Sequence, residues 1–174
     1  MGKNTMKRRL FNQSALAALL VAGTVVMTGC GFKMRGSFSY AFKTLLSGFG
    51  DTSTLGNEFK RVLAADGVVQ LVTDPEKAQV VLEVISEQRE KVVVGTTSSG
   101  QVREFQLRIR LKFKLRTPSG KDIIPETELL VQRDISFNES AVLAKEAEEG
   151  LLYRDMQTDM VQQLLRRLAA IKEL

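Results

Sequence analysis

The chain has 174 residues, of which 25 are Lys or Arg and 20 are Asp or Glu, so its formal net charge is +5. It contains no His, no Trp and one Cys, which excludes Ser-His-Asp and Cys-His catalysis, His-ligated zinc and an intramolecular disulfide. Four basic residues and no acidic ones precede Cys30, so the remainder is nearly neutral, with 21 basic and 20 acidic side chains. Nucleic-acid binding needs a basic surface on the folded domain and is therefore not expected.

A basic stretch, an apolar run and a small-residue segment follow one another at the N-terminus. Residues 3–9 carry the positive charge, residues 16–27 are mostly apolar, and residues 27–30 read Met-Thr-Gly-Cys. This order is typical of a secretory signal peptide. The apolar run, about 12 residues, is shorter than the roughly 20 that span a bilayer. We therefore expect residues 1–29 to be removed on export.

The small residues before Cys30 resemble the bacterial lipobox. The resemblance implies that Cys30 becomes the acylated N-terminus of the mature chain. Gly31 stands where retention at the inner membrane usually has Asp, which implies sorting to the outer membrane. An ordinary secretory signal followed by a spare cysteine is the alternative.

Between residues 38 and 72 the hydrophobic period changes from strand to helix and back. Aromatic residues alternate with polar or small ones from Phe38, which predicts a strand over 38–46. A loop over 47–53 leads into a helix over 54–66, closed by Gly67 at the position where glycine ends helices. Residues 68–72 predict a short buried strand.

Three longer strands are predicted in the middle of the chain. Residues 80–94 are rich in Val and Ile, residues 105–115 alternate strictly between apolar and polar, and residues 123–137 form the third strand. Turn residues separate them at 98–100 and 118–121. A last helix is predicted over 140–171, after Asn138 as its cap.

These elements predict an α+β fold in one domain, residues 30–174. The order is strand, helix, strand, three-strand meander, helix. Both helices and the sheet have one apolar face, so the expected packing is a two-layer α/β sandwich with a mixed sheet and both helices on one face. The first strand–helix–strand unit predicts a parallel crossover.

The polar face of the central strand is a row of basic residues, including Arg108 and Lys112. We expect Lys112 to face Glu87 and Glu128, so ion pairs on a solvated face explain one end of the row. At the other end the expected register places Arg108 beside Lys91. Like charges in that position destabilise a sheet unless an anion binds there, and a slip of one residue removes the argument.

No spacing typical of a catalytic or cofactor site is present. The acidic residues at 146, 148 and 149 are typical of a solvated helix face, and Gly95 and Gly100 lack the spacing of a phosphate-binding loop. No cofactor and no metal are expected. Acid–base catalysis by carboxylates alone, as in a periplasmic hydrolase, stays open.

The segment after the signal peptide is similar to a known family. Cys30-Gly31-Phe32-Lys33-Met34-Arg35-Gly36 resembles the mature N-terminus of the LptE family of lipopolysaccharide-assembly lipoproteins. Residues 61–68, 100–107, 142–149 and 156–168 agree with further family motifs in the same order. The resemblance spans nearly the whole mature chain.

The resemblance implies a non-enzymatic lipoprotein on the periplasmic side of the outer membrane, anchored by Cys30. It would plug the β-barrel of its partner LptD and bind lipopolysaccharide. Lys145 matches a basic position that the family uses at the start of the last helix. The family's hairpin position is Ser98 here, so Arg103 across the turn is the expected substitute, and Arg108 completes the expected site. A lipoprotein accessory to another transport or assembly complex, without lipopolysaccharide binding, is the alternative.

Overall fold

The computed structural model describes residues 38–174, so Cys30 and the signal segment 1–29 lie outside the described residues. The sheet is mixed, with the strand order β2-β1-β3-β4-β5; β1 is parallel to β2 and β3, and β3, β4 and β5 form an antiparallel meander. The elements are β1 (Thr44–Ser47), α2 (Thr54–Asp66), β2 (Gln70–Val72), β3 (Val80–Thr96), β4 (Val102–Arg116), β5 (Asp122–Ser136) and α3 (Val142–Ala169), with 3-10 turns at Pro75–Lys77 and Glu139–Ala141.

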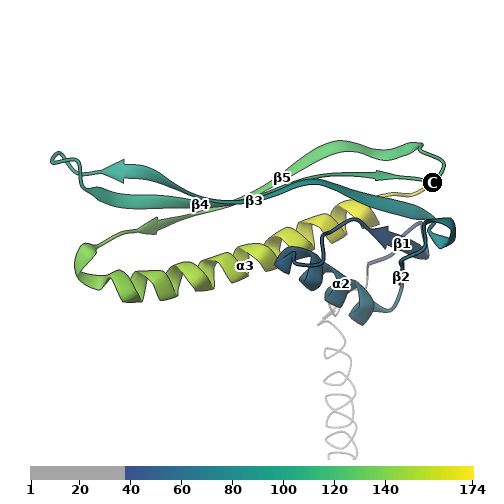
Figure 1. The fold of residues 1–174 in the computed structure, drawn as a ribbon, viewed down its shortest axis with the longest axis horizontal. Helices are drawn as coiled ribbons and strands as arrows, with labels where there is room; N and C mark the ends of the chain where they lie inside the picture. Colours follow the sequence, from purple (N-terminus) through teal and green to yellow (C-terminus); the bar gives the residue numbers. More distant parts are fainter. Residues whose placement is uncertain (1–37) are drawn as a thin grey trace, which may run out of the picture. The chain divides into compact units, whose positions relative to one another are not determined.

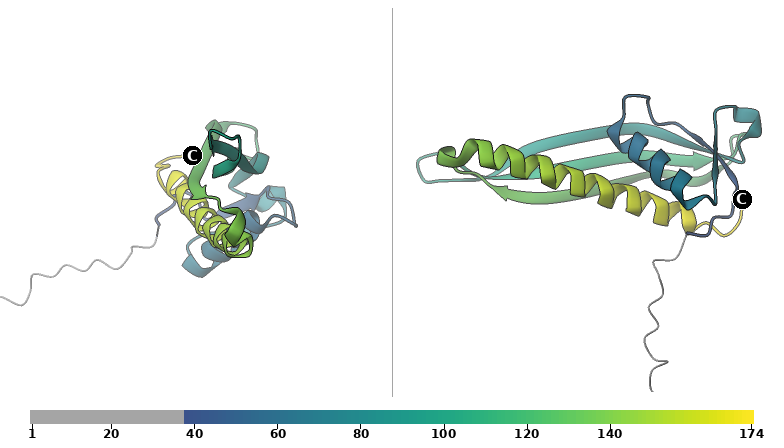
Figure 2. Two further views of the ribbon diagram at one scale, coloured as in Figure 1. Left: turned by 90° about the vertical axis from the view of Figure 1, so that its left-hand side faces the viewer. Right: turned by 90° about the horizontal axis from the view of Figure 1, so that it is seen from below.

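Both helices lie on the same side of the sheet, which confirms the predicted two-layer α+β fold (Figure 1). Helix α3 runs along the sheet and packs against β4 and β5, whereas α2 lies beside the C-terminal half of α3, near β1 and β2 (Figure 2). The parallel pairing of β1 with β2 confirms the parallel crossover around α2.

The core lies between β4 and the two helices. The odd-numbered side chains of β4 from Leu107 to Leu115 are buried, and apolar residues of α2 and α3 pack against them. Removal of this apolar surface from water is the main contribution to the stability of the domain. The principal members are Leu107, Leu111, Phe113 and Leu115 on β4, Phe59 and Leu63 on α2, and Met156, Met160, Leu164 and Leu168 on α3.

The predicted first strand is wrong over its first half. Only Thr44–Ser47 forms β1, and Phe38 to Phe42 precede it without strand pairing. The neighbouring strands begin at Gln70 and Val80, which pair with Thr44 and Leu45, so the chain before β1 has no strand to join. The aromatic side chains of this segment pack in or against the core instead, and Phe42 is 1% exposed.

The predicted register was right for one hairpin and wrong for the other. Across β4 and β5, Lys112 faces Glu128 as expected, and Arg108 faces Gln132. Across β3 and β4, Arg108 faces Glu90 and not Lys91. A β-bulge between Val84 and Ser86 adds one residue to β3, so the β3 side chains from Ser86 to Val93 point to the opposite face of the sheet from the one expected.

The bulge changes the character of β3. Before it, Val80 and Leu82 point into the core; beyond it, the helix-facing row consists of Glu87, Arg89 and Lys91. The opposite, outer face carries the basic row of β4, and ion pairs balance much of it. These pairs are Arg110–Glu128 at 2.6 Å, Lys112–Glu128 at 3.7 Å, Lys114–Glu83 at 3.4 Å and Arg116–Glu83 at 3.1 Å.

The ion pairs of Glu83 make a pH-dependent contribution to stability. The Arg116 guanidinium, with Lys114, holds the pKa of Glu83 below its ordinary value of 4.5. A lowered folded-state pKa means that the contribution is complete above the unfolded-state pKa and is lost as the pH falls through the folded-state pKa. We therefore expect Glu83→Gln to lower the thermal midpoint at about pH 6, with the difference from wild type shrinking as the pH falls through the folded-state pKa of Glu83. A difference that is constant across this range would contradict the assignment.

Candidate functional site

The β3–β4 hairpin and the start of α3 meet at one end of the molecule, here called the distal end (Figure 1). Phe137 is the residue that joins them. Its backbone N–H donates to the Arg103 carbonyl at 2.7 Å, and Asn138 then caps the 3-10 turn that leads into α3 by accepting from Ser140 N–H at 3.0 Å. The first turn of α3 therefore lies beside the β3–β4 hairpin.

Two lysines lie at this end, one on each layer. Lys145 of α3 donates to Ser136 Oγ at 3.0 Å and to Glu148 Oε2 at 2.8 Å. Lys91 of β3 lies 4.3 Å from the centre of the Phe105 ring and pairs with Glu149 Oε2 at 2.6 Å. Both lysines border one small cavity of about 60 Å³, so two ammonium groups share an aromatic-lined recess.

Arg103 lies on the other side of Phe137. It borders a second hollow of about 310 Å³, together with Gln101, Asn138 and Glu139, and Phe137 borders both spaces. The Phe137 and Phe105 rings meet edge to face, with 5.4 Å between their centres. The structure thus places Arg103 and Lys145 around one aromatic pair, and we call these residues with Lys91 the distal cationic cluster.

Arg108 does not belong to this cluster. Its neighbours Leu107 and Ile109 are buried beneath the helices, and side chains alternate along a strand, so Arg108 points to the outer face of the sheet. Its Nε donates to Gln106 Oε1 at 2.8 Å, and Gln106 in turn donates to Asp134 at 2.9 Å.

Apolar side chains are also exposed near the cluster. Leu143 is 82% exposed in the first turn of α3, and Val93 and Val94 on β3 are each close to half exposed. Cations beside exposed apolar groups suit a ligand that is anionic at one part and apolar at another.

Lys91 was missed as a site residue by sequence reasoning. The expected register placed it on the outer face, and only the bulge at Ile85 turns it toward α3. No composition signal marks the bulge, since Val, Ile and Ser follow one another there without Gly or Pro. Its partner Glu149 was assigned to a solvated helix face, whereas the structure pairs it with Lys91.

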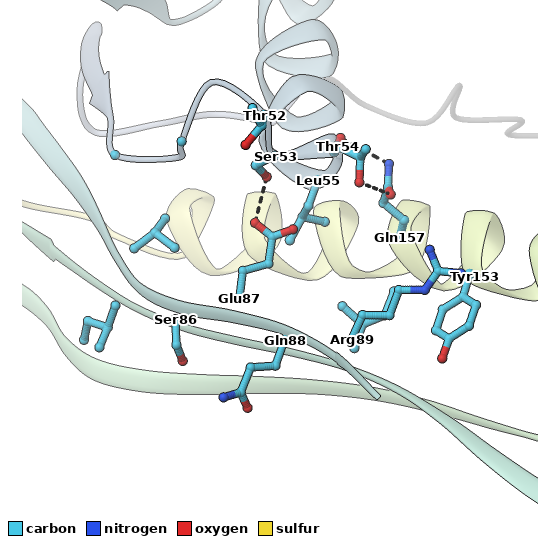
Figure 3. Close-up of a pocket in the computed structure, with 15 residues that line it drawn as sticks. Thr52, Ser53, Thr54, Leu55, Ser86, Glu87, Gln88, Arg89, Tyr153 and Gln157 are labelled. Atoms are coloured by element: carbon cyan, nitrogen blue, oxygen red, sulfur yellow. Dashed lines mark hydrogen bonds between the residues drawn. The ribbon is translucent and has the colours of Figure 1, made fainter. Parts of the chain in front are cut away.

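Within residues 38–174 no group of three His, Cys, Asp or Glu side chains could hold a metal ion. In the same part of the chain, no helix combines the length and the apolar character needed to cross a membrane. The largest of the cavities described, about 500 Å³, lies away from the distal cationic cluster, beside the middle of β3 (Figure 3).

Comparison with known proteins identifies the family. The family model LptE, described as lipopolysaccharide-assembly, matches residues 42–168, which is most of the chain. The chain belongs to the LptE family. An LPS-assembly lipoprotein LptE of Pectobacterium atrosepticum is 29% identical over 171 residues, covering 95% of this chain and 88% of its own length. The LptE of Yersinia enterocolitica is 29% identical over 160 residues, covering 90% and 76%.

Solved structures of lipoproteins share the fold. Lipoprotein B from Nitrosomonas europaea superposes with a TM-score of 0.70 at 33% identity, covering 80% of this chain and 91% of its own. A minor lipoprotein from Acinetobacter baumannii gives a TM-score of 0.62 at 25% identity, with coverage of 76% and 94%. The LptE-family fold assignment therefore rests on both sequence and structure.

Proposed function

We propose that the chain is a non-enzymatic outer-membrane lipoprotein that plugs and helps assemble an LptD β-barrel and binds lipopolysaccharide for insertion into the outer leaflet. The observation that carries the proposal is the match of the LptE family over residues 42–168. The acyl chains on Cys30 anchor the domain on the periplasmic side of the membrane, and no cofactor or metal is required.

The outer face of the sheet supports the plug role. It presents Arg108, Arg110 and Lys112 with carboxylates from the neighbouring strands, and α2 and α3 leave this face uncovered. The lumen of a membrane β-barrel is polar. A charged, ion-paired sheet face is therefore compatible with insertion into such a lumen, where an apolar face would not be.

The distal cationic cluster supports lipopolysaccharide binding. Arg103, Lys91 and Lys145 bring three cations to one end of the domain, and Leu143 exposes an apolar side chain nearby. Charge-assisted hydrogen bonds to phosphate are about twice as strong as neutral ones. The phosphates of lipid A fit the cations, and its acyl chains fit the exposed apolar side chains.

The proposed function is tested by purifying the tagged lipoprotein from detergent-solubilised outer membranes. We expect a large β-barrel protein to accompany it in stoichiometric amount, identified by mass spectrometry. A lipoprotein that purifies without a barrel would contradict the plug role. Recovery with a different transport complex, and no affinity for lipopolysaccharide, would favour the accessory function instead.

Charge reversal in the cluster tests the binding site. The variant Lys145→Glu with Arg103→Glu replaces two attractive contacts with two repulsive ones. We expect lipopolysaccharide affinity to fall by about tenfold or more, since tenfold corresponds to only about 1.4 kcal/mol. The matched control, Arg61→Glu with Lys121→Glu, makes the same charge change away from the cluster and should retain affinity. Equal affinity in the two variants would rule out this site.

The glutamates of the cluster compete with an anionic ligand for its lysines. Glu148 and Glu149 hold Lys145 and Lys91 at 2.8 and 2.6 Å. Exposed ion pairs of this kind are worth about 0.2–1 kcal/mol. Two such pairs together correspond to about two- to thirtyfold, and we therefore expect Glu148→Gln with Glu149→Gln to strengthen lipopolysaccharide binding within this range. Glu146→Gln removes a neighbouring carboxylate that pairs with no described lysine and is the control; a gain equal to that of the double variant would indicate net charge as the cause.

A further inference from the structure

The strand β3 has an unpaired edge in the middle of the fold. β3 is 17 residues long and β1 only 4, and β1 pairs with β3 over Val80–Leu82 alone. Gly48 N–H still donates to the Leu82 carbonyl at 2.8 Å, and the chain then turns away toward α2. Beyond Leu82, no strand within residues 38–174 pairs with β3 on the side away from β4.

This edge presents main-chain hydrogen-bonding groups. In an antiparallel pair, alternate residues direct both N–H and C=O away from their partner strand. Half of the residues of β3 beyond Leu82 therefore point these groups toward the position that a longer β1 would occupy. Exposed edges of this kind accept a further strand from another chain.

The groove beside this edge has the place and size for such a strand. It measures about 500 Å³ and runs along residues 84–89 of β3. Its opposite wall is the loop 48–53 that follows β1, and Tyr153 and Gln157 of α3 complete it (Figure 3). Tyr153 donates its hydroxyl to the Glu90 carbonyl at 2.7 Å, which marks the distal end of the accessible edge.

The groove is lined by both apolar and polar side chains: Leu55, Val84 and Ile85 are among the apolar ones, and several of the polar ones pair with one another. Ser53 donates to Glu87 Oε2 at 2.7 Å, and Thr54 donates to Gln157 Oε1 at 3.1 Å. Arg89 is different: its guanidinium lies 3.4 Å from the centre of the Tyr153 ring, and no carboxylate of residues 38–174 forms an ion pair with it. The groove thus offers backbone groups and one cation without an acidic partner.

We propose that an extended segment of the β-barrel partner binds in this groove, adds a short strand to β3 over residues 84–88, and places an acidic side chain against Arg89. The inference rests on the proposed function, which supplies the partner. A lipid chain is less suited to the groove, because it has no hydrogen-bonding groups along its length and would leave the main-chain N–H and C=O groups of the β3 edge unpaired. A second copy of the domain does not fit either. The β3 strand of that copy would bring its paired β4 with it, whereas the groove has room for only one segment between β3 and the loop 48–53.

Hydrogen–deuterium exchange on the full lipoprotein, alone and in the purified barrel complex, tests the inference. Amides of residues 84–89 that point outward should exchange about tenfold or more slowly in the complex, because they gain hydrogen bonds. β5 is the opposite edge strand, and no other strand within residues 38–174 pairs with its outer side, so its outward amides serve as the internal reference.

A charge variant makes the test specific for the groove. In the complex of the Arg89→Glu variant, we expect residues 84–89 to exchange as fast as in the free chain while the barrel still co-purifies. Arg61→Glu, the same change at an exposed position of α2 outside the groove, should keep the protection. Both results together support the inference.

Three outcomes would overturn it. A barrel complex in which residues 84–89 exchange as in the free chain removes the inference and leaves the proposed function standing. Protection that appears in the isolated lipoprotein and grows with its concentration assigns the groove to a second copy. A lipoprotein that purifies without any barrel overturns the inference and the proposed function together.

Discussion

Replacing Phe113 with alanine is expected to lower the free energy of unfolding by about 3–5 kcal/mol. Phe113 is fully buried in β4, between β3 and β5, and its ring belongs to the single core that joins the sheet to α2 and α3. The strands on both sides fix its backbone, since it pairs with Val84 and Thr127, so the cavity left by the ring cannot collapse freely. Urea unfolding of wild type and variant measures the difference.

The neighbouring residue provides the control for this prediction. Lys114 lies on the same strand with its side chain on the outer face, where it pairs with Glu83 at 3.4 Å. An exposed ion pair contributes little to stability, so Lys114→Ala should be far less destabilising than Phe113→Ala. If Phe113→Ala and Lys114→Ala were equally destabilising, the assignment of the two faces of β4 would be wrong.

Replacing Cys30 with serine is expected to release the chain from the membrane. The lipobox resemblance implies that this thiol is acylated, and no helix in residues 38–174 is long and apolar enough to cross a membrane. A single myristoyl chain binds membranes only marginally, with K of about 10⁴ M⁻¹, so stable attachment requires the several chains of a mature lipoprotein. Without them, copies that exceed the number of barrels should be found in the soluble periplasmic fraction.

Fractionation of cells that overproduce the lipoprotein measures this effect, because most copies then have no barrel to hold them. Mass spectrometry of the wild-type N-terminal peptide should show acyl chains on Cys30. The folded domain is the control: the Cys30→Ser variant should unfold at the same temperature as wild type. A variant that stays in the membrane fraction under these conditions would show that another segment provides the anchor, and the ordinary secretory signal would then be favoured.

Sequence periodicity was sufficient for most of the fold because the strands have simple patterns. The strict alternation over residues 105–115 marked β4 and its two faces, and the left-handed glycines Gly100 and Gly120, with φ of 83° and 95°, lie in the predicted hairpin turns. The predicted β4–β5 register also placed Lys112 opposite Glu128 correctly, since no irregularity interrupts that ladder between Glu104 and Phe113.

The two errors in the predicted fold, the length of the first strand and the register of β3 against β4, arose from contacts between segments that are distant in the sequence. The aromatic residues from Phe38 alternate like a strand, yet strand formation also needs a neighbour, and the neighbouring strands begin only at Gln70 and Val80. The bulge at Ile85 depends on how β3 packs across the whole sheet. Its effect on the candidate site was large, since it moved Lys91 into the distal cationic cluster. Arg103 and Lys145 meet there as predicted, whereas Arg108 is kept on the outer face by the alternation of β4 itself.

The bulge at Ile85 also governs how the distal hairpin can be exchanged between relatives. Odd-numbered side chains of β3 point to opposite faces of the sheet before and after the bulge. A hairpin taken from a relative whose β3 has no bulge would therefore place its basic side chains on the outer face and not beside α3. A chimera keeps its binding residues beside α3 only if the crossover lies before Val84 and the donor's own irregularity is carried with it. An alignment that places a gap within residues 84–86 therefore assigns the following positions of β3 to the opposite face of the sheet, even where the residue types agree.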